Sequence, residues 1–169
     1  LGGSLFVAVA AQINVPMYPV PVTLQTLAIL IVGLSFGSRL GALTLVAYLG
    51  EGVMGLPVFA NAMNGAAFVG PTAGFLVGFV GMAYLAGLMA DRGIKNVAIL
   101  SLGTIAISGL VYVPGVAWGM WLGEIAGFDA SKLGADSFSS IWQWDMSTFL
   151  IGDGLKAVFA VLFVTGDWN

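Results

Sequence analysis

The chain has 169 residues, of which 59% are hydrophobic and only 8% are charged, and its formal net charge is −3. Soluble domains carry about 25% charged residues, so a chain with a mean hydropathy of +1.02 has too little polar surface to face water and is predicted to be an integral membrane protein. The absence of cysteine and histidine excludes disulfides, iron–sulfur clusters and the commonest metal ligand, and the small negative charge argues against nucleic-acid binding.

The first apolar segment, Leu1–Ile13, is predicted to be a helix. A helix of this length rises about 20 Å, which is short for a hydrocarbon core of about 30 Å, so we expect it to be truncated at its N-terminus or to continue to Val15. Ser4 and Ala8 form a small-xxx-small pair, which is typical of a close-packing helix face. Ordinary packing inside a bundle explains the same spacing.

The next segment, Asn14–Thr23, contains three prolines and is predicted to be extended rather than helical. Its backbone groups would be unsatisfied in lipid, so it should fold over one end of the bundle or line a cavity. A second helix is expected over 24–36, with Gln25 in its first turn. Gln25 either hydrogen-bonds a ligand or is an ordinary polar residue between helices.

The middle of the chain is predicted to contain a tight turn, a helix and a polar loop. The turn falls at 37–39, and the third helix spans 40–50 and reaches Glu51 and Met54. The loop over 58–70 carries Asn61 and Asn64, whose amide groups offer donors and acceptors without charge. These side chains are therefore candidates for contacts with an uncharged part of a ligand.

The second half of the chain is predicted to contain three more helices. The fourth spans 71–90 and starts at a proline, which suits a first position because that N–H is unpaired anyway. A charged turn at 91–95 leads to a fifth helix over 96–121. A polar loop at 128–145 precedes the last helix, over 147–165. The expected fold is thus an all-α membrane protein, a single domain over residues 1–169 built as a bundle of six transmembrane helices.

The distribution of charge predicts the orientation in the membrane. With both termini in the cytoplasm, the cytoplasmic turns hold Arg39, Arg92 and Lys95, as the positive-inside rule requires. The proline-rich segment and the Asn61–Asn64 loop then meet the start of the last helix as ordered extracellular loops. We expect a shallow pocket there, suited to a small, mostly apolar molecule with a few polar groups.

Two charged residues, Asp153 and Lys156, lie inside the last predicted helix. Residues three apart share a helix face and can touch. A carboxylate and an ammonium at membrane depth cost roughly a few kcal/mol each unless they are paired or hydrated. The pair is therefore either a polar ligand site inside the bundle or a structural ion pair that fixes the rotation of the helix, and we favour the ligand site.

Several blocks of sequence resemble a known family, the BioY family of biotin-binding S components of energy-coupling factor (ECF) transporters. The most specific block is Pro-Val-Pro-Val-Thr-Leu-Gln-Thr-Leu-Ala at 19–28. The other similar blocks are at 11–13, 37–41, 55–60, 70–75 and 152–156. Two features depart from the family pattern: Ile151 and Gly154 replace a proline and a leucine, and the Asn61–Asn64 stretch is bulkier than the family's glycine pair.

The resemblance implies a substrate-capture subunit, not an enzyme, in the plasma membrane of a bacterium or archaeon. Such a subunit binds extracellular biotin and is energised by a transmembrane T component and two ATPase subunits. The chain itself lacks a Gly-Lys-Ser/Thr phosphate loop, so ATP would bind only to the partners and no cofactor or metal is expected here. The alternatives are an S component for another vitamin and a proton-coupled carrier that uses Asp153 as its relay.

The resemblance also implies roles for individual residues. Asp153 would accept from the N–H groups of the biotin ureido ring, and Lys156 would donate to the ureido carbonyl or neutralise the biotin carboxylate. Small residues on the first helix dock the T component in the family, which implies this role for Ser4 and Ala8. The candidates for supplementary contacts with biotin are Tyr18, Thr23, Gln25, Phe59, Asn61 and Asn64.

Overall fold

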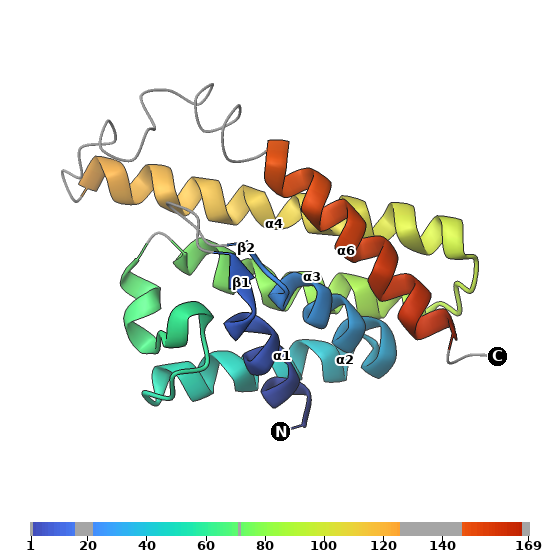
Figure 1. The fold of residues 1–169 in the computed structure, drawn as a ribbon, viewed down its shortest axis with the longest axis horizontal. Helices are drawn as coiled ribbons and strands as arrows, with labels where there is room; N and C mark the ends of the chain where they lie inside the picture. The colour runs from blue at the N-terminus through green and yellow to red at the C-terminus, as the bar shows by residue number, and fades with distance from the viewer. Residues whose placement is uncertain (1, 16–21, 71, 126–146, 167–169) are drawn as a thin grey trace.

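The computed structural model describes residues 2–15, 22–70, 72–125 and 147–166. Among these residues the fold is a bundle of helices with one short hairpin (Figure 1). The elements are α1 (Gly2–Gln12), β1 (Asn14–Val15), β2 (Val22–Thr23), α2 (Gln25–Val53), the 3₁₀ helices η1 (Ala60–Ala62) and η2 (Gly65–Val69), α3 (Ala73–Asp91), α4 (Val97–Ile125) and α6 (Ser147–Gly166).

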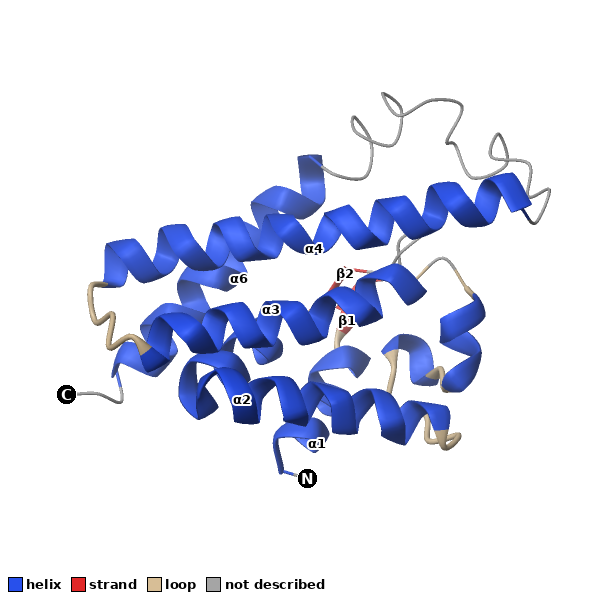
Figure 2. Cartoon of the chain, turned by 180° about the vertical axis from the view of Figure 1, so that it is seen from behind, coloured by secondary structure: helices blue, strands red, loops and turns tan. Residues whose placement is uncertain are grey.

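The helices pack in layers, with α3 between α2 and α4 (Figure 2). The α6 helix packs on both α2 and α4, and α1 packs on α2. Ile29, Leu45, Met82, Leu100 and Val161 are fully buried between these helices. Because they come from α2, α3, α4 and α6, the four helices share one apolar core.

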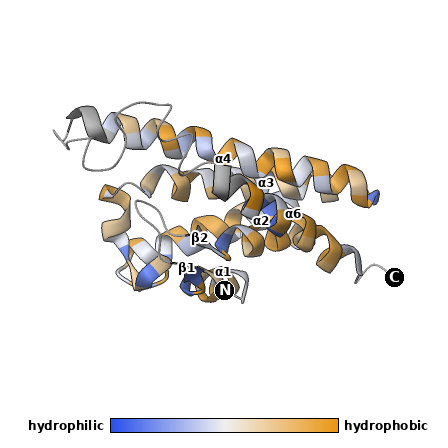
Figure 3. Cartoon of the chain, turned by 45° about the horizontal axis from the view of Figure 1, so that its top comes forward, coloured by the Kyte–Doolittle hydropathy of each residue, from blue (hydrophilic) through white to orange (hydrophobic). Residues whose placement is uncertain are grey.

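The helices consist mostly of hydrophobic residues (Figure 3), and many large apolar side chains are exposed, as expected for a protein surrounded by lipid. Within the described residues, Ala73–Asp91 and Val97–Trp121 are each long and apolar enough to cross a membrane, and so is the whole of Gln25–Val53, although this stretch is divided at Gly37 into two shorter halves. Large side chains such as Leu43, Leu102 and Phe159 are exposed on these and neighbouring helices. In water such a surface would cause aggregation, whereas in a bilayer it is the contact with acyl chains.

The α2 helix is interrupted at Gly37, where the chain reverses direction. Gly37 has φ 79° and ψ 176°, a conformation that favours glycine because L side chains rarely adopt it. A Cβ on Gly41 would lie 3.1 Å from the Cα of Gly33. Residues eight apart in a continuous helix would be about 12 Å apart, so the two halves of α2 must fold back on each other. The turn predicted at 37–39 is therefore confirmed.

The end of α3 holds this turn in place. The Asp91 carboxylate accepts a hydrogen bond of 3.0 Å from the Ser38 backbone N–H and a short one from the Ser38 hydroxyl. A Cβ on Gly87 would collide with the backbone of Gly37 and Ser38, so glycine at 87 lets α3 approach the turn closely. The turn is thus fixed to α3 by a charged hydrogen bond and by backbone contact.

Glycines on α3 also set its distance from α4. A Cβ on Gly74 would collide with the backbone carbonyl of Pro114, and one on Gly78 would lie 3.1 Å from the Pro114 ring. Gly74 and Gly78 therefore face the proline inside α4 and allow the two helices to approach closely. Trp118, one turn further along α4, donates a 3.0 Å hydrogen bond to the carbonyl of Gly70.

Several boundaries differ from the sequence-based predictions. The third helical stretch ends at Val53, close to the predicted end at Met54, whereas α4 continues beyond its predicted end to Ile125. The α3 helix begins at Ala73 with Thr72 as its N-cap, two residues later than predicted. The 58–70 loop contains η1 and η2, and the segment after α1 forms the antiparallel pair β1–β2, with Asn14 opposite Thr23. The 3₁₀ turns and the two-residue strands are too short to produce a repeating pattern of hydrophobic residues, so no sign of them is visible in the sequence.

Candidate ligand-binding site

The two charged residues of α6 form an ion pair inside the bundle. The Lys156 Nζ lies 2.9 Å from the Asp153 Oδ1, and the side chains are 13% and 8% exposed, respectively. The spacing of three residues along α6 brings them together, as the sequence predicts. Since both groups are largely removed from solvent, the pair requires further polar partners to be stable.

Three other elements supply these partners. The Tyr112 hydroxyl of α4 donates a 2.6 Å hydrogen bond to the Asp153 Oδ2. The Thr26 hydroxyl, in the first turn of α2, donates a 3.1 Å hydrogen bond to the Asp153 Oδ1. Lys156 donates a 2.7 Å hydrogen bond to the backbone carbonyl of Thr23 in β2 and lies 3.5 Å from the Thr26 Oγ1. We call these five residues the Asp153 cluster.

The hairpin β1–β2 and the start of α2 position the threonines of this cluster. The backbone N–H of Leu24 donates to the carbonyl of Ile13, 3.0 Å away, which ties the start of α2 to the end of α1. The Thr23 hydroxyl accepts from the backbone N–H of Gln25 at 3.2 Å. The Thr23 carbonyl is thereby held towards α6, where it receives the Lys156 ammonium.

Gln25 and Phe59 belong to a neighbouring buried network. The Gln25 Nε2 donates to the Tyr48 hydroxyl at 3.0 Å, and this hydroxyl donates to the carbonyl of Val58 at 2.9 Å. The Phe59 ring is buried and packs edge-on against Tyr48 and Phe68. The network fastens the start of the 58–70 loop to α2. A contact of Gln25 or Phe59 with a ligand stays a prediction.

Asn61 and Asn64 lie on the exposed part of this loop. Asn61 is in the left-handed region, with φ 58°, and Asn64 caps η2 by accepting a 3.2 Å hydrogen bond from the N–H of Ala66. Gln12 of α1 clamps the loop, because its amide donates to the Phe59 carbonyl at 2.9 Å and accepts from the Ala62 N–H at 3.0 Å. Contact of either asparagine with a ligand stays a prediction.

The proline-rich residues 16–21, and with them Tyr18, lie outside the described part of the chain, as does the loop predicted at 128–145. Of the eight residues predicted to bind a ligand, the structure brings together Asp153, Lys156 and Thr23. Gln25 bonds to Thr23 through its backbone N–H and is linked through Tyr48 to the loop that carries Phe59, and the two asparagines lie on the exposed part of that loop.

Comparison with known proteins now assigns the family. The model of the BioY family matches residues 1–169. The chain is 35% identical over 163 residues to a probable biotin transporter BioY of Pyrococcus horikoshii, covering 94% of this chain and 89% of the relative. A biotin transporter BioY of Rhodobacter capsulatus is 34% identical over 165 residues, with 94% and 84% covered. The chain belongs to the BioY family.

The fold agrees with this assignment to the BioY family. The structure superposes on the crystal structure of the S component for biotin from an ECF-type ABC transporter with a TM-score of 0.65, covering 97% of this chain and 85% of that one. The two sequences are 24% identical, so this likeness concerns the fold. Together with the apolar helices, the family establishes that the chain is a multi-pass membrane protein.

The small residues of α1 face the interior of the chain. Ser4 is buried, and its hydroxyl donates a 2.8 Å hydrogen bond to Glu51 of α2. Ala8 is also buried. The pair Ser4–Ala8 thus serves close packing of α1 on α2 within one chain, which was the alternative explanation of this spacing. Docking of a partner through these residues stays a prediction.

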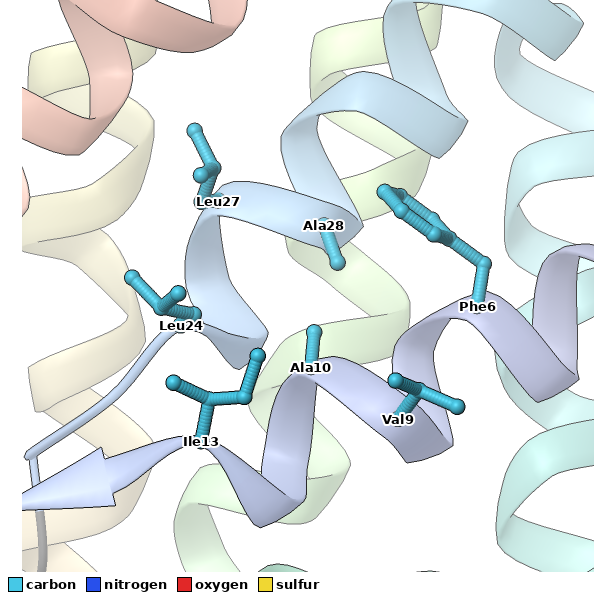
Figure 4. Close-up of a pocket in the computed structure, with 7 residues that line it drawn as sticks. All are labelled: Phe6, Val9, Ala10, Ile13, Leu24, Leu27 and Ala28. Atoms are coloured by element: carbon cyan, nitrogen blue, oxygen red, sulfur yellow. The ribbon is translucent and has the colours of Figure 1, made fainter.

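An apolar groove of about 150 Å³ lies between α1 and the first turns of α2 (Figure 4). It differs from the predicted ligand pocket, because it contains neither member of the ion pair and its lining offers a polar molecule no hydrogen bonds. Its lining residues are Phe6, Val9, Ala10, Ile13, Leu24, Leu27 and Ala28.

Sequence reasoning missed Tyr112 and Thr26 as members of the Asp153 cluster. Thr104, Ser108 and Tyr112 recur every four residues on α4 and are all buried. A polar stripe on one face of an otherwise apolar helix indicates a polar partner inside the bundle. This stripe was the signal that could have identified Tyr112 before the structure was known.

Proposed function

We propose that this BioY-family chain is the biotin-binding S component of an ECF-type importer, a subunit that captures extracellular biotin and is not an enzyme. The observation that carries the proposal is the buried Asp153–Lys156 pair, held at 2.9 Å within a bundle of apolar helices. The two relatives named above point to the same ligand, since one is a biotin transporter and the other a probable biotin transporter.

The chemistry of biotin suits the pair. The ureido ring of biotin presents N–H donors beside a carbonyl acceptor on one edge. A carboxylate and an ammonium in contact present the complementary acceptor and donor. Charged groups in a site that excludes water make stronger hydrogen bonds than neutral ones, so this pair can hold an uncharged ureido ring firmly. The apolar side chains around it can cover the ring and the valeryl chain.

The proposed architecture is a bundle of six helices, in which the two halves of α2 count separately. Both termini would lie in the cytoplasm, together with the Ser38–Asp91 contact and the basic residues Arg39, Arg92 and Lys95. The hairpin and the 58–70 loop would then be extracellular and would cover the entrance to the Asp153 cluster. Of the supplementary contacts, Thr23 is supported by its bond to Lys156; Tyr18, Gln25, Phe59, Asn61 and Asn64 complete the proposed set.

We further propose that the chain works in a plasma membrane with a T component and two ATPase subunits, and that α1 contacts the T component through Ser4 and Ala8. Helices in lipid associate by close approach of their backbones, so Ala8→Trp should prevent co-purification of the partners while biotin binding is retained. Because Ala8 is buried within the chain, loss of both biotin and partners would mean that α1 supports the fold. Val9→Trp is the matched control on the exposed side of α1. If only the Val9 variant loses its partners, the T component docks on the exposed side instead.

The purified chain should bind biotin stoichiometrically without ATP or metal, because the Asp153 cluster is assembled within a single chain. Isothermal titration calorimetry of the detergent-solubilised protein with biotin, thiamine and riboflavin tests this directly. We expect heat of binding with biotin alone. Binding of thiamine or riboflavin without binding of biotin would assign the site to another vitamin.

A further inference from the structure

The Tyr112 hydroxyl contacts the Asp153 carboxylate on the oxygen that Lys156 does not bind. Tyr112 is buried, and its ring packs edge-on against Phe75 of α3, with 5.8 Å between ring centroids and 90° between ring planes. The Phe75 ring occupies the space above Gly115, where a Cβ would collide with it. The hydroxyl is therefore held by packing between α3 and α4 and does not depend on α6 for its position.

The described partners occupy most of the acceptor capacity of Asp153. A carboxylate has about four lone-pair positions, two on each oxygen. The Oδ1 atom accepts from both Thr26 and Lys156, and the Oδ2 atom accepts from Tyr112. Counting the described residues, one position on Oδ2 remains. It can accept one N–H group of a ligand without breaking any of these bonds.

The same count applies to the donors of Lys156. Its ammonium has three N–H groups. Two of them make bonds of 2.9 Å to Asp153 and 2.7 Å to the Thr23 carbonyl, and among the described residues the third has only the 3.5 Å contact with the Thr26 hydroxyl. One donor is therefore weakly engaged and can turn to a ligand carbonyl.

We propose that Tyr112 is a positioning residue, which orients the Asp153 carboxylate so that Oδ2 accepts one ureido N–H while Lys156 donates to the ureido carbonyl. Asp153 then accepts a hydrogen bond from one of the two ureido N–H groups, and the other ureido N–H is bound by residues outside the Asp153–Lys156 pair. This inference rests on the biotin-binding function proposed above. Without the Tyr112 hydroxyl, the carboxylate can rotate about its Oδ1 bonds, and the Oδ2 position is lost as a fixed acceptor.

The test compares Tyr112→Phe with wild type in calorimetric titrations of three ligands. The ligands are biotin and its two cyclic carbamate analogues, in each of which one ureido N–H is replaced by oxygen. The matched control is Tyr84→Phe, which removes a hydroxyl from a half-exposed tyrosine on α3. Thermal unfolding in detergent checks that each variant is folded.

We expect Tyr112→Phe to weaken biotin binding by about tenfold, since hydrogen bonds to charged groups are among the stronger ones, and Tyr84→Phe to bind like wild type. In wild type, one carbamate should bind much more weakly than the other. For that carbamate, Tyr112→Phe should cause no further loss, whereas the other carbamate should lose as much as biotin does.

Two results would overturn the positioning role. One is an equal loss for biotin and both carbamates in Tyr112→Phe, which is what a purely structural role predicts. The other is unchanged biotin binding in that variant. Wild-type protein that does not bind biotin would instead overturn the proposed function itself, and this outcome is distinguishable because it appears before any variant is compared.

Discussion

Asp153→Asn and Lys156→Ala are each expected to weaken biotin binding by about a hundredfold or more, because truncating one member of a buried charge pair leaves the other unpaired. The structure strengthens this expectation in two ways. Both side chains are largely buried, and each bonds to groups on other elements, Asp153 to Tyr112 and Lys156 to Thr23. Calorimetric titration of folded variants measures the effect.

The double variant should lose less than the sum of the two single losses. Residues in contact are coupled by about 0.5–3 kcal/mol, and once one charge is gone the second truncation removes less. Lys95→Ala is the control, since this lysine is exposed in the turn between α3 and α4 and should not affect binding. Single variants that fold normally and bind biotin like wild type would show that the pair is only structural.

Gly74→Ala is expected to destabilise the protein by about 2 kcal/mol, within the range for overpacked sites. The added Cβ would collide with the Pro114 carbonyl and approach the Cβ of Trp118. Backbone and Cβ atoms cannot move aside as the end of a flexible side chain can, so α3 and α4 would have to separate. This movement should also displace Tyr112 and thereby weaken biotin binding.

Gly81→Ala, on the same helix, is the matched control, because its added Cβ meets no atom within 4 Å. Alanine favours a helix over glycine by up to about 1 kcal/mol, so this variant should be as stable as wild type or slightly more stable. The midpoint of thermal unfolding in detergent compares the two. Equal midpoints for Gly74→Ala and Gly81→Ala would mean that close approach at Pro114 does not support the fold.

The sequence predicted those features that depend on local patterns. The scarcity of charge made Asp153 and Lys156 conspicuous, and their spacing along one helix was enough to predict that they touch. The chain reversal at 37–39 followed from a glycine and two polar residues between apolar runs. Each of these predictions concerns residues close in the chain, for which helix geometry determines the outcome.

The pairing of Asp153 with its partners was not predictable in this way, because a local pattern such as the polar stripe on α4 marks Tyr112 as an interior polar residue but does not say which residue it meets. Tyr112 and Asp153 are 41 residues apart, and Thr26 and Asp153 are 127 apart. Their contacts depend on which faces of α2, α4 and α6 meet, and the glycine contacts of α3 with Pro114 contribute to that arrangement. The start of α3 was also misplaced, because a proline suited to a first helical turn gave no sign that Thr72 would be the cap.

A structure of the protein determined with biotin bound tests the central claim most directly. We predict that the ureido ring lies against the Asp153–Lys156 pair, with one N–H on the Asp153 Oδ2, the carbonyl on the Lys156 Nζ and the Tyr112 hydroxyl still bonded to the carboxylate. Biotin bound elsewhere in the bundle, with the residues of the Asp153 cluster hydrogen-bonded only to one another, would contradict the account.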